Sequence, residues 1–245
     1  MKRLVLVIAA LLAAVAGFGL WRRTHPSGWV AIAPGVELRM LSASDDEGSV
    51  AVTALRAPAA KIRVLSGDNL VAPDWRAREN ALAAVNGGFF DPQEKPLGLI
   101  IHRSRRAGRL RHVSGGVFFI ENGAAHILPV AAFARRLTAG ARITEALQCS
   151  PLLVTAGQVS QLKPQSARRT GIGVQPDGKV VIAVADDDIA LPAWAKLWAA
   201  SGGLDCRDAL NLDGGPSTQL SVRAPGRRLE IVGGWSVPDV ILVIR

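Results

Sequence analysis

The feature that most limits the fold is a succession of short apolar runs, many alternating with polar residues, that begins near residue 29 and continues to the C-terminus. Examples are SVAVTALRA (49–57), KVVIAVA (179–185) and DVILVIR (239–245). Runs of this length, bounded by Gly, Pro and Asp, are typical of β-strands. About a dozen such runs predict a domain built mainly of sheets.

Two segments instead show helical periodicity, VAAFARRLTAG (130–140) and LPAWAKLWAASGG (191–203). The second carries one stripe of large apolar residues, Leu191, Trp194, Leu197 and Trp198. Glycines follow this stripe, as they commonly follow the end of a helix. We interpret the tryptophans as core residues rather than as a platform for a ligand, because they lie on one apolar stripe. A few helices among many strands predict an α+β fold, in which mixed β-sheets are packed with a few helices.

Local turn signals support this order of elements. Asn122-Gly123 separates two apolar runs and predicts a two-residue hairpin. The stretch Pro176-Asp177-Gly178 predicts a second hairpin turn. Asp74 precedes a short polar segment and is expected to cap a short helix.

The 245 residues divide into an N-terminal segment and one predicted domain over 29–245. Residues 4–20 are uncharged and apolar, and basic residues flank them. Residues 1–21 are therefore either a cleaved signal peptide or an N-terminal membrane anchor, and 22–28 form a polar linker. Both alternatives predict an exported domain, periplasmic or extracellular, with membrane anchoring through 4–20 in the second.

The chain is strongly basic, with a formal net charge of +9. A surplus of this kind favours anionic partners such as phosphorylated glycans, although a solvated basic surface explains it equally simply. The basic stretch from His102 to His112 contains no aromatic residue. Because single-stranded nucleic acids bind through aromatic stacking as well as charge, this composition argues against nucleic acid as a partner.

Cys149 and Cys206 are the only cysteines, and an exported protein permits them either to pair or to stay as buried thiols. No zinc-binding spacing is present, and no cofactor is expected. The adjacent acids Asp186, Asp187 and Asp188 would ordinarily be a solvated loop, but their oxygens are also ligands of the kind that a divalent cation takes.

Polar residues of catalytic type recur directly after apolar runs. They are Asn86 with Asp91, the group Arg168-Arg169-Thr170, Asp186, and Asn211 with Asp213. Loops at strand ends are where sites are usually built, because the scaffold holds the side chains while the loop stays accessible. The glycines in Asn86-Gly87-Gly88 and Asp213-Gly214-Gly215 are equally compatible with simple chain reversals.

The ordered motifs VNGGFFD, QCSPLLVTAGQV, RRTGIGVQPDGKVVIAVAD and DALNLDGGPSTQL resemble the phosphodiester glycosidase family. The resemblance covers roughly residues 80–245 and implies that family's fold. It further implies hydrolysis of a sugar joined through its anomeric oxygen to a phosphodiester. The pocket that it implies consists of Asn86, Gly87, Asp91, Arg169, Thr170, Asp186, Asp213, Gly214, Gly215 and Ser217.

Within this implied pocket, Asp213 is the leading candidate for nucleophile or water-activating base, with Asp186 or Asp91 as the second carboxylate. Arg169, helped by Arg168, is expected to bind the phosphate. Asn86 and Ser217 are expected to bind sugar hydroxyls. Backbone amides of Gly87, Gly88, Gly214 and Gly215 are expected to approach the ligand.

The sequence departs from the family pattern at Ser150, at Pro216 and at Asp186-Asp187. These departures permit an altered substrate and weaken the assignment of Asp186. Two alternatives to hydrolysis stay open: a non-catalytic envelope protein that binds an anionic glycan or cell-wall polymer, and transfer of the sugar to another hydroxyl.

Overall fold

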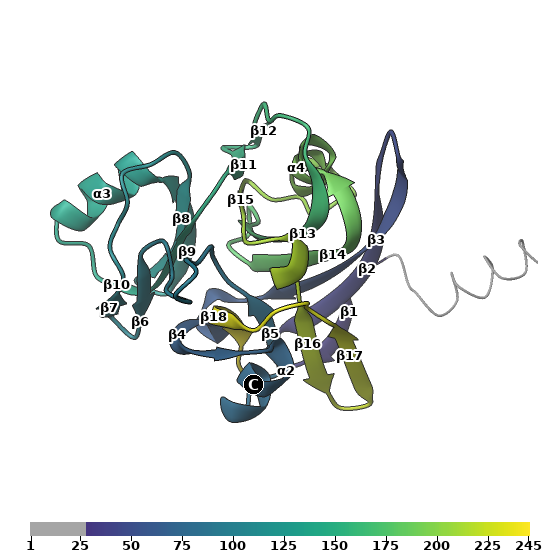
Figure 1. Cartoon of the computed structure of the whole chain (residues 1–245), viewed down its shortest axis with the longest axis horizontal. Helices are drawn as coiled ribbons and strands as arrows, with labels where there is room; N and C mark the ends of the chain where they lie inside the picture. Colours follow the sequence, from purple (N-terminus) through teal and green to yellow (C-terminus); the bar gives the residue numbers. More distant parts are fainter. Residues whose placement is uncertain (1–27) are drawn as a thin grey trace, which may run out of the picture.

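A computed structural model describes residues 28–245, which form three β-sheets and three short α-helices (Figure 1). Sheet I has eight strands in the order β1 (Val30–Ala33), β2 (Val36–Asp45), β3 (Gly48–Ala57), β14 (Val180–Ala190), β13 (Ser166–Val174), β15 (Asp208–Asn211), β11 (Leu152–Thr155) and β12 (Gln158–Val159).

The two smaller sheets have five strands each. Sheet II has the order β7 (Arg105–Ala107), β6 (Ile100–His102), β10 (Ile143–Cys149), β8 (Gly116–Glu121) and β9 (Ala124–Pro129). Sheet III has the order β17 (Arg227–Ile231), β16 (Leu220–Ala224), β5 (Ala83–Asn86), β18 (Val237–Val243) and β4 (Ile62–Leu70). Helical segments are η1 (Ala59–Lys61), α2 (Ala72–Arg78), α3 (Val130–Thr138), α4 (Leu191–Ala199) and η2 (Gly215–Ser217).

All three sheets contribute to one central apolar core, and a separate helix covers part of the opposite face of each sheet. The central core takes residues such as Ile172 from sheet I, Phe118 from sheet II and Val85 from sheet III. Helix α4 packs on sheet I, α3 on sheet II and α2 on sheet III, each with its own apolar cluster (Figure 1). Because strands such as β8 and β18 are buried on both faces, their sequences are apolar almost throughout.

The α+β class with a few packed helices is confirmed, while the pairing between the described strands is antiparallel rather than mixed. Both predicted hairpin turns are also confirmed. Asn122 and Gly123 join β8 to β9 with positive φ angles, and Gly178 has a positive φ between β13 and β14. The capping role expected of Asp74 is wrong: the N-cap of α2 is Val71, and Asp74 lies in the first turn.

The two cysteines do not form a disulfide. Cys149 belongs to the central core and Cys206 to the cluster beneath α4, and both are buried free thiols. The alternative in which they pair is therefore wrong for this structure. The proposed signal peptide or anchor (1–21) and nearly all of the proposed linker lie outside the described residues. Within residues 28–245, no helix is long and apolar enough to cross a membrane.

Helix α4 is packed as its apolar stripe predicts. Trp194 and Trp198 are fully buried and meet edge to face, with ring centroids 5.4 Å apart. Gly171 and Gly173 of β13 lie directly beneath Trp198, and a Cβ atom at Gly173 would stand 2.7 Å from the Cys206 sulfur and 2.8 Å from the indole. The missing side chains of β13 therefore make room for the tryptophan.

We predict that Gly173→Ala destabilises the domain by about 1–3 kcal/mol, because the added methyl overpacks this contact. Urea unfolding followed by circular dichroism measures the change. Gly28→Ala is the matched control, since a Cβ atom there has no neighbour within 4 Å. Equal stability of the two variants would show that β13 and α4 are not packed this tightly.

Candidate active site

The candidate site lies where β5 of sheet III meets β13 and β15 of sheet I, and the side chain of Asn86 joins these elements. Asn86 is fully buried at the end of β5. Its Oδ1 accepts the Thr170 hydroxyl at 2.8 Å and the Gln219 amide at 3.1 Å, and its Nδ2 donates to the Asp213 carbonyl at 2.8 Å. The side-chain amide of Asn86 thus bonds to neighbouring protein groups and holds the chain around Asp213 in place.

Asp213 lies two residues after the end of β15 and is half-buried at this junction. Its backbone amide donates to the Gly87 carbonyl at 3.1 Å, and its Oδ1 accepts the Gly214 amide at 2.9 Å. Burial raises the pKa of the carboxyl, while the Ser217 hydroxyl and the Gly214 amide oppose that rise. The chain therefore presents a partly desolvated acid at a rigid junction of two sheets.

A second acid, Asp239 on β18, lies behind the Gly87-Gly88 turn. Its Oδ1 accepts the Gly88 amide at 2.6 Å, and a Cβ atom on Gly87 would stand 1.9 Å from the same oxygen. Glycine at position 87 is therefore required by this close approach. Full burial raises the pKa of Asp239 to about 8, the Gly88 amide opposes the rise, and the charge of Asp213 adds to it.

Two buried polar atoms beside Asp213, Ser217 Oγ and Asp239 Oδ2, lack a hydrogen bond of good geometry within the described structure. Ser217 nevertheless lies close enough to Asp213 to lower its pKa. Because buried polar groups are nearly always paired, unpaired ones gathered at one place are typical of a site that a polar ligand or water completes.

The two arginines of β13 lie on opposite faces of sheet I. Arg169 shares the α4 face with Gly171 and Gly173, and its guanidinium donates to the carbonyls of Ile189 and Gln165. Burial lowers its pKa. Arg168 lies on the side of the site, where its carbonyl oxygen would stand 2.6 Å from a Cβ atom on Gly214. The structure therefore does not bring Arg169 together with Asp213.

Asp186 lies next to Arg168 rather than next to Asp213. Strand β14 continues through Asp186–Asp188, which bulge against β13 between the pairs Arg169–Ala185 and Ala167–Ile189. Asp186 is exposed and forms a 2.5 Å ion pair with Arg168, whose guanidinium also donates to the Val232 carbonyl. Residues Asp186–Asp188, which were expected to form a loop after the strand, thus belong to β14. The carboxylate of Asp186 neutralises Arg168.

The carboxylate of Asp91 forms hydrogen bonds within its own turn. Its Oδ1 accepts the backbone amides of Gln93 and Lys95, both at 2.9 Å, and its backbone pairs with Lys95. Such a side chain closes a local turn. Of the three predicted carboxylates, the structure therefore places only Asp213 at the Asn86 junction, and the neighbouring acid is Asp239.

The remaining predicted residues line the same junction. Asn211 donates from Nδ2 to the Ser150 carbonyl at 3.3 Å and to the Leu212 carbonyl at 2.6 Å. Gly214 contacts the backbone of Arg168 so closely that no side chain fits, and Gly215 opens η2 with a φ of +55°. These contacts give the glycines structural reasons to be present, and Gly215 in addition leaves open space where a side chain would project.

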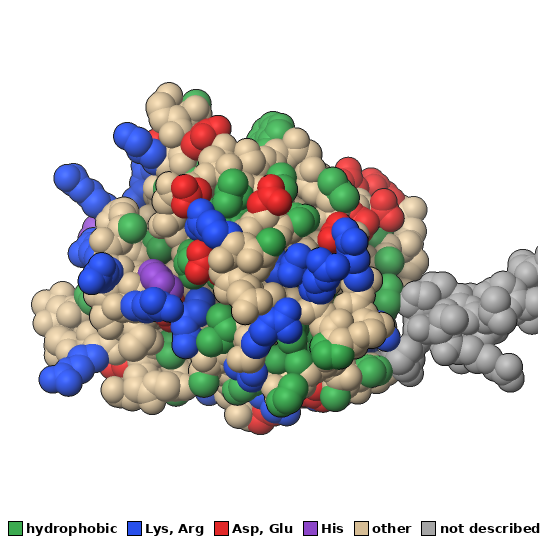
Figure 2. Space-filling model, turned by 90° about the horizontal axis from the view of Figure 1, so that it is seen from below, with side chains coloured by type: hydrophobic (Ala, Val, Ile, Leu, Met, Phe, Trp, Pro, Cys, Tyr) green, Lys and Arg blue, Asp and Glu red, His purple; other side chains and the backbone are tan. Residues whose placement is uncertain are grey.

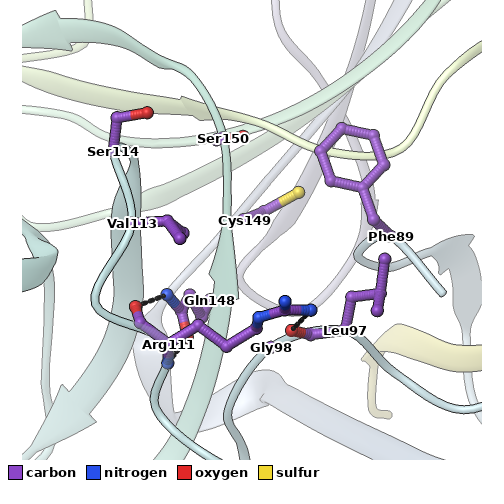
Figure 3. Close-up of a pocket in the computed structure, with 9 residues that line it drawn as sticks. All are labelled: Phe89, Leu97, Gly98, Arg111, Val113, Ser114, Gln148, Cys149 and Ser150. Carbon is purple, nitrogen blue, oxygen red and sulfur yellow. Dashed lines mark hydrogen bonds between the residues drawn. The ribbon is translucent and has the colours of Figure 1, made fainter. Parts of the chain in front are cut away.

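An apolar pocket adjoins the junction (Figure 3). It has a volume of about 190 Å³ and is lined by Phe89, Leu97, Gly98, Arg111, Val113, Ser114, Gln148, Cys149 and Ser150. The charges of Asp213 and Asp239 both act on the Cys149 thiol, and burial raises its pKa to about 12. Cys149 therefore stays a neutral thiol on the boundary between the pocket and the two acids.

Sequence reasoning missed Asp239 and the pocket. A usable signal for Asp239 is its position in VPDVILV, where one charged residue interrupts a strand whose seven residues are all buried. A carboxyl in such a strand is rarely tolerated without a function or a partner. Among residues 28–245, no group of three or more His, Cys, Asp or Glu side chains is arranged to hold a metal ion, Asp186–Asp188 included.

Fold and site together define a β-rich domain with a half-buried acid, Asp213, and a fully buried neighbouring acid, Asp239, at a sheet junction. The sequence profile of the phosphodiester glycosidase family matches residues 79–244. The chain therefore belongs to the phosphodiester glycosidase family. No curated protein matches the chain.

Three solved structures share the fold. The catalytic domain of zebrafish N-acetylglucosamine-1-phosphodiester alpha-N-acetylglucosaminidase, auto-inhibited by its pro-peptide, superposes with a TM-score of 0.71 at 17% identity, over 88% of this chain and 85% of that chain. A hypothetical protein from Synechocystis gives 0.63 at 15% identity, over 89% and 63%. A putative exported protein from Burkholderia pseudomallei gives 0.58 at 14% identity, over 80% and 74%.

We predict that Asp239 makes the folded domain lose stability as the pH rises. Its pKa is about 8 when folded and about 4 when unfolded. The folded state therefore holds a proton that the unfolded state has released, and stability falls between about pH 4 and pH 8. Asp239→Asn removes this loss, so its stability relative to wild type should rise by roughly 2–4 kcal/mol from pH 5 to pH 8.

Urea unfolding at both pH values measures this difference. The control is Asp187→Asn, because Asp187 is exposed on β14 whereas Asp239 is fully buried. Parallel pH profiles for wild type and Asp239→Asn would show that Asp239 is not buried as a neutral acid.

Proposed function

We propose that this protein hydrolyses a sugar-1-phosphodiester at the anomeric carbon, with Asp213 as the catalytic carboxylate. The observation that carries the proposal is the placement of Asp213 at the Asn86 junction beside glycine amides and unpaired buried polar atoms. Membership of the phosphodiester glycosidase family supports the reaction class. The apolar segment 4–20 supports an exported location for this activity.

The chemistry of the substrate explains why a carboxylate suits this position. Cleavage of a glycosyl phosphate builds positive charge on the sugar ring, which a carboxylate stabilises. The anionic oxygens of the phosphodiester would instead be repelled by the same carboxylate, by about 4 kcal/mol at 4 Å with an effective dielectric constant of 20. Asp213 therefore faces the anomeric carbon, and the phosphate lies further away.

In the proposed step, Asp213 accepts a proton from a water molecule whose oxygen bonds to the anomeric carbon. The bond between that carbon and the phosphate oxygen breaks, and its electron pair leaves with the phosphate monoester. Because phosphate is already a good leaving group, a strong acid opposite Asp213 is not required. The products are a free sugar and a phosphate monoester.

Asp239 complements Asp213 as a positioning residue. Its raised pKa, about 8, keeps it neutral at pH 7, so only one negative charge resides on the two neighbouring acids. Its bond to the Gly88 amide holds the Gly87-Gly88 turn, and the Gly87 carbonyl in turn accepts the Asp213 amide. Asp239 thus supports the backbone on which Asp213 depends.

We predict that Asp213→Asn lowers the rate of sugar release from a 1-phosphodiester of N-acetylglucosamine by a factor of about 10²–10⁴, the usual contribution of a catalytic base. N-acetylglucosamine is the first sugar to test because the similar zebrafish enzyme acts on it. A coupled assay for free sugar, run over a panel of 1-phosphodiesters, measures the rate.

Asp91→Asn and Asp186→Asn are the matched controls, because neither carboxylate lies at the Asn86 junction. Both should retain more than half of the wild-type rate. Equal rates for wild type and Asp213→Asn would remove Asp213 from the reaction. A panel without any released sugar would favour the alternative of a protein that binds anionic glycans.

A further inference from the structure

The pocket next to the candidate site has an apolar rim that a sugar-binding surface does not need. Phe89 and Leu97 are each 37% exposed and Val113 is 56% exposed, and all three line the same 190 Å³ cavity. Figure 3 shows the Cys149 thiol pointing toward the Phe89 ring. A cavity of this size has room for about six water-sized groups.

The pocket adjoins the catalytic junction through Ser150 and Phe89. Ser150 lines the pocket, and its carbonyl accepts the side chain of Asn211, two residues before Asp213. Phe89 lines the pocket and follows Gly88, whose amide binds Asp239. A ligand that spans the two spaces would therefore have one end at Asp213 and the other against Phe89.

A positive charge stands in the wall of this apolar pocket. The guanidinium of Arg111 donates to the Leu97 carbonyl at 3.5 Å and has no carboxylate partner within the described residues (Figure 3). Exposed arginines Arg103, Arg105, Arg106 and Arg109 precede it in the chain. Figure 2 shows Lys and Arg side chains gathered at the end of the molecule that carries sheet II.

We propose that this pocket binds an apolar alcohol that is esterified to the substrate phosphate, with Arg111 holding the phosphate between the alcohol and the sugar. This inference rests on the proposed function and adds the chemical class of the leaving group. The substrate is then a sugar 1-phosphate diester of an alkyl or similarly apolar alcohol.

The distribution of polar groups favours this orientation over the reverse. Unpaired polar atoms of Ser217 and Asp239 lie beside Asp213, on the side where sugar hydroxyls require partners. The pocket side offers mainly apolar surface, which gains little from a sugar and much from a hydrocarbon chain. Arg168 is paired with Asp186 and Arg169 is buried against backbone carbonyls, whereas Arg111 is exposed in the pocket wall and has no carboxylate partner within the described residues.

Binding of two simple probes tests the pocket without reference to catalysis. Isothermal titration calorimetry should show that hexyl phosphate binds at least ten-fold more tightly than methyl phosphate. Val113→Asp should remove this preference, and Arg111→Gln should weaken both phosphates at least five-fold. Val159→Asp and Arg135→Gln, at exposed positions outside the pocket, should leave both affinities unchanged.

Kinetics on two substrates separate this proposal from the proposed function. The methyl and hexyl diesters of N-acetylglucosamine 1-phosphate differ only in the alcohol. In the wild-type protein the KM of the hexyl diester should be at least ten-fold lower than that of the methyl diester. In Val113→Asp this difference should disappear. Equal KM values with measurable release of sugar would overturn the alcohol pocket while the proposed function stands. Tight hexyl phosphate binding without hydrolysis of either diester would support the pocket and contradict the proposed function.

Discussion

The side-chain amide of Asn86 is the interaction on which the organisation of the site depends. It is fully buried, and it joins the end of β5 in sheet III to Thr170 in sheet I, to the backbone of Gln219 and to the carbonyl of Asp213. A side-chain amide can donate from its nitrogen and accept at its oxygen, so Asn86 serves all three partners. Without it, three buried partners would lose hydrogen bonds at once, each loss costing about 1–3 kcal/mol.

The same junction explains how an acid is held in a partly apolar setting. Asp213 and Asp239 are neighbours, and burial raises the pKa of both carboxyls, that of Asp239 to about 8. Asp239 is therefore a neutral support beside Asp213 at pH 7. Gly87 makes this possible, because only a residue without a side chain fits between its backbone and the Asp239 carboxyl.

Strand periodicity made much of the fold predictable, since buried runs such as KVVIAVA and turns such as Asn122-Gly123 are local properties. The composition of the site was harder to predict from the sequence. Arg169, which was predicted to bind phosphate, is two residues before Gly171 in β13, so both residues lie on the face of the strand that α4 covers. The alternation of side chains along β13 could have revealed this. The bulge at Asp186–Asp188 interrupts the pairing of the neighbouring strands β13 and β14 without a turn residue to mark it. The approach of Asp239 to Gly87 depends on pairing between distant strands, which no local pattern encodes.

The proposed reaction occurs at the anomeric carbon rather than at phosphorus. Hydrolysis of an N-acetylglucosamine 1-phosphodiester in water enriched with oxygen-18, with the products analysed by mass spectrometry before the sugar exchanges its anomeric oxygen, tests this directly. We predict that the label enters the released sugar and that the phosphate monoester stays unlabelled. Label in the phosphate product would contradict it, because attack would then have taken place at phosphorus.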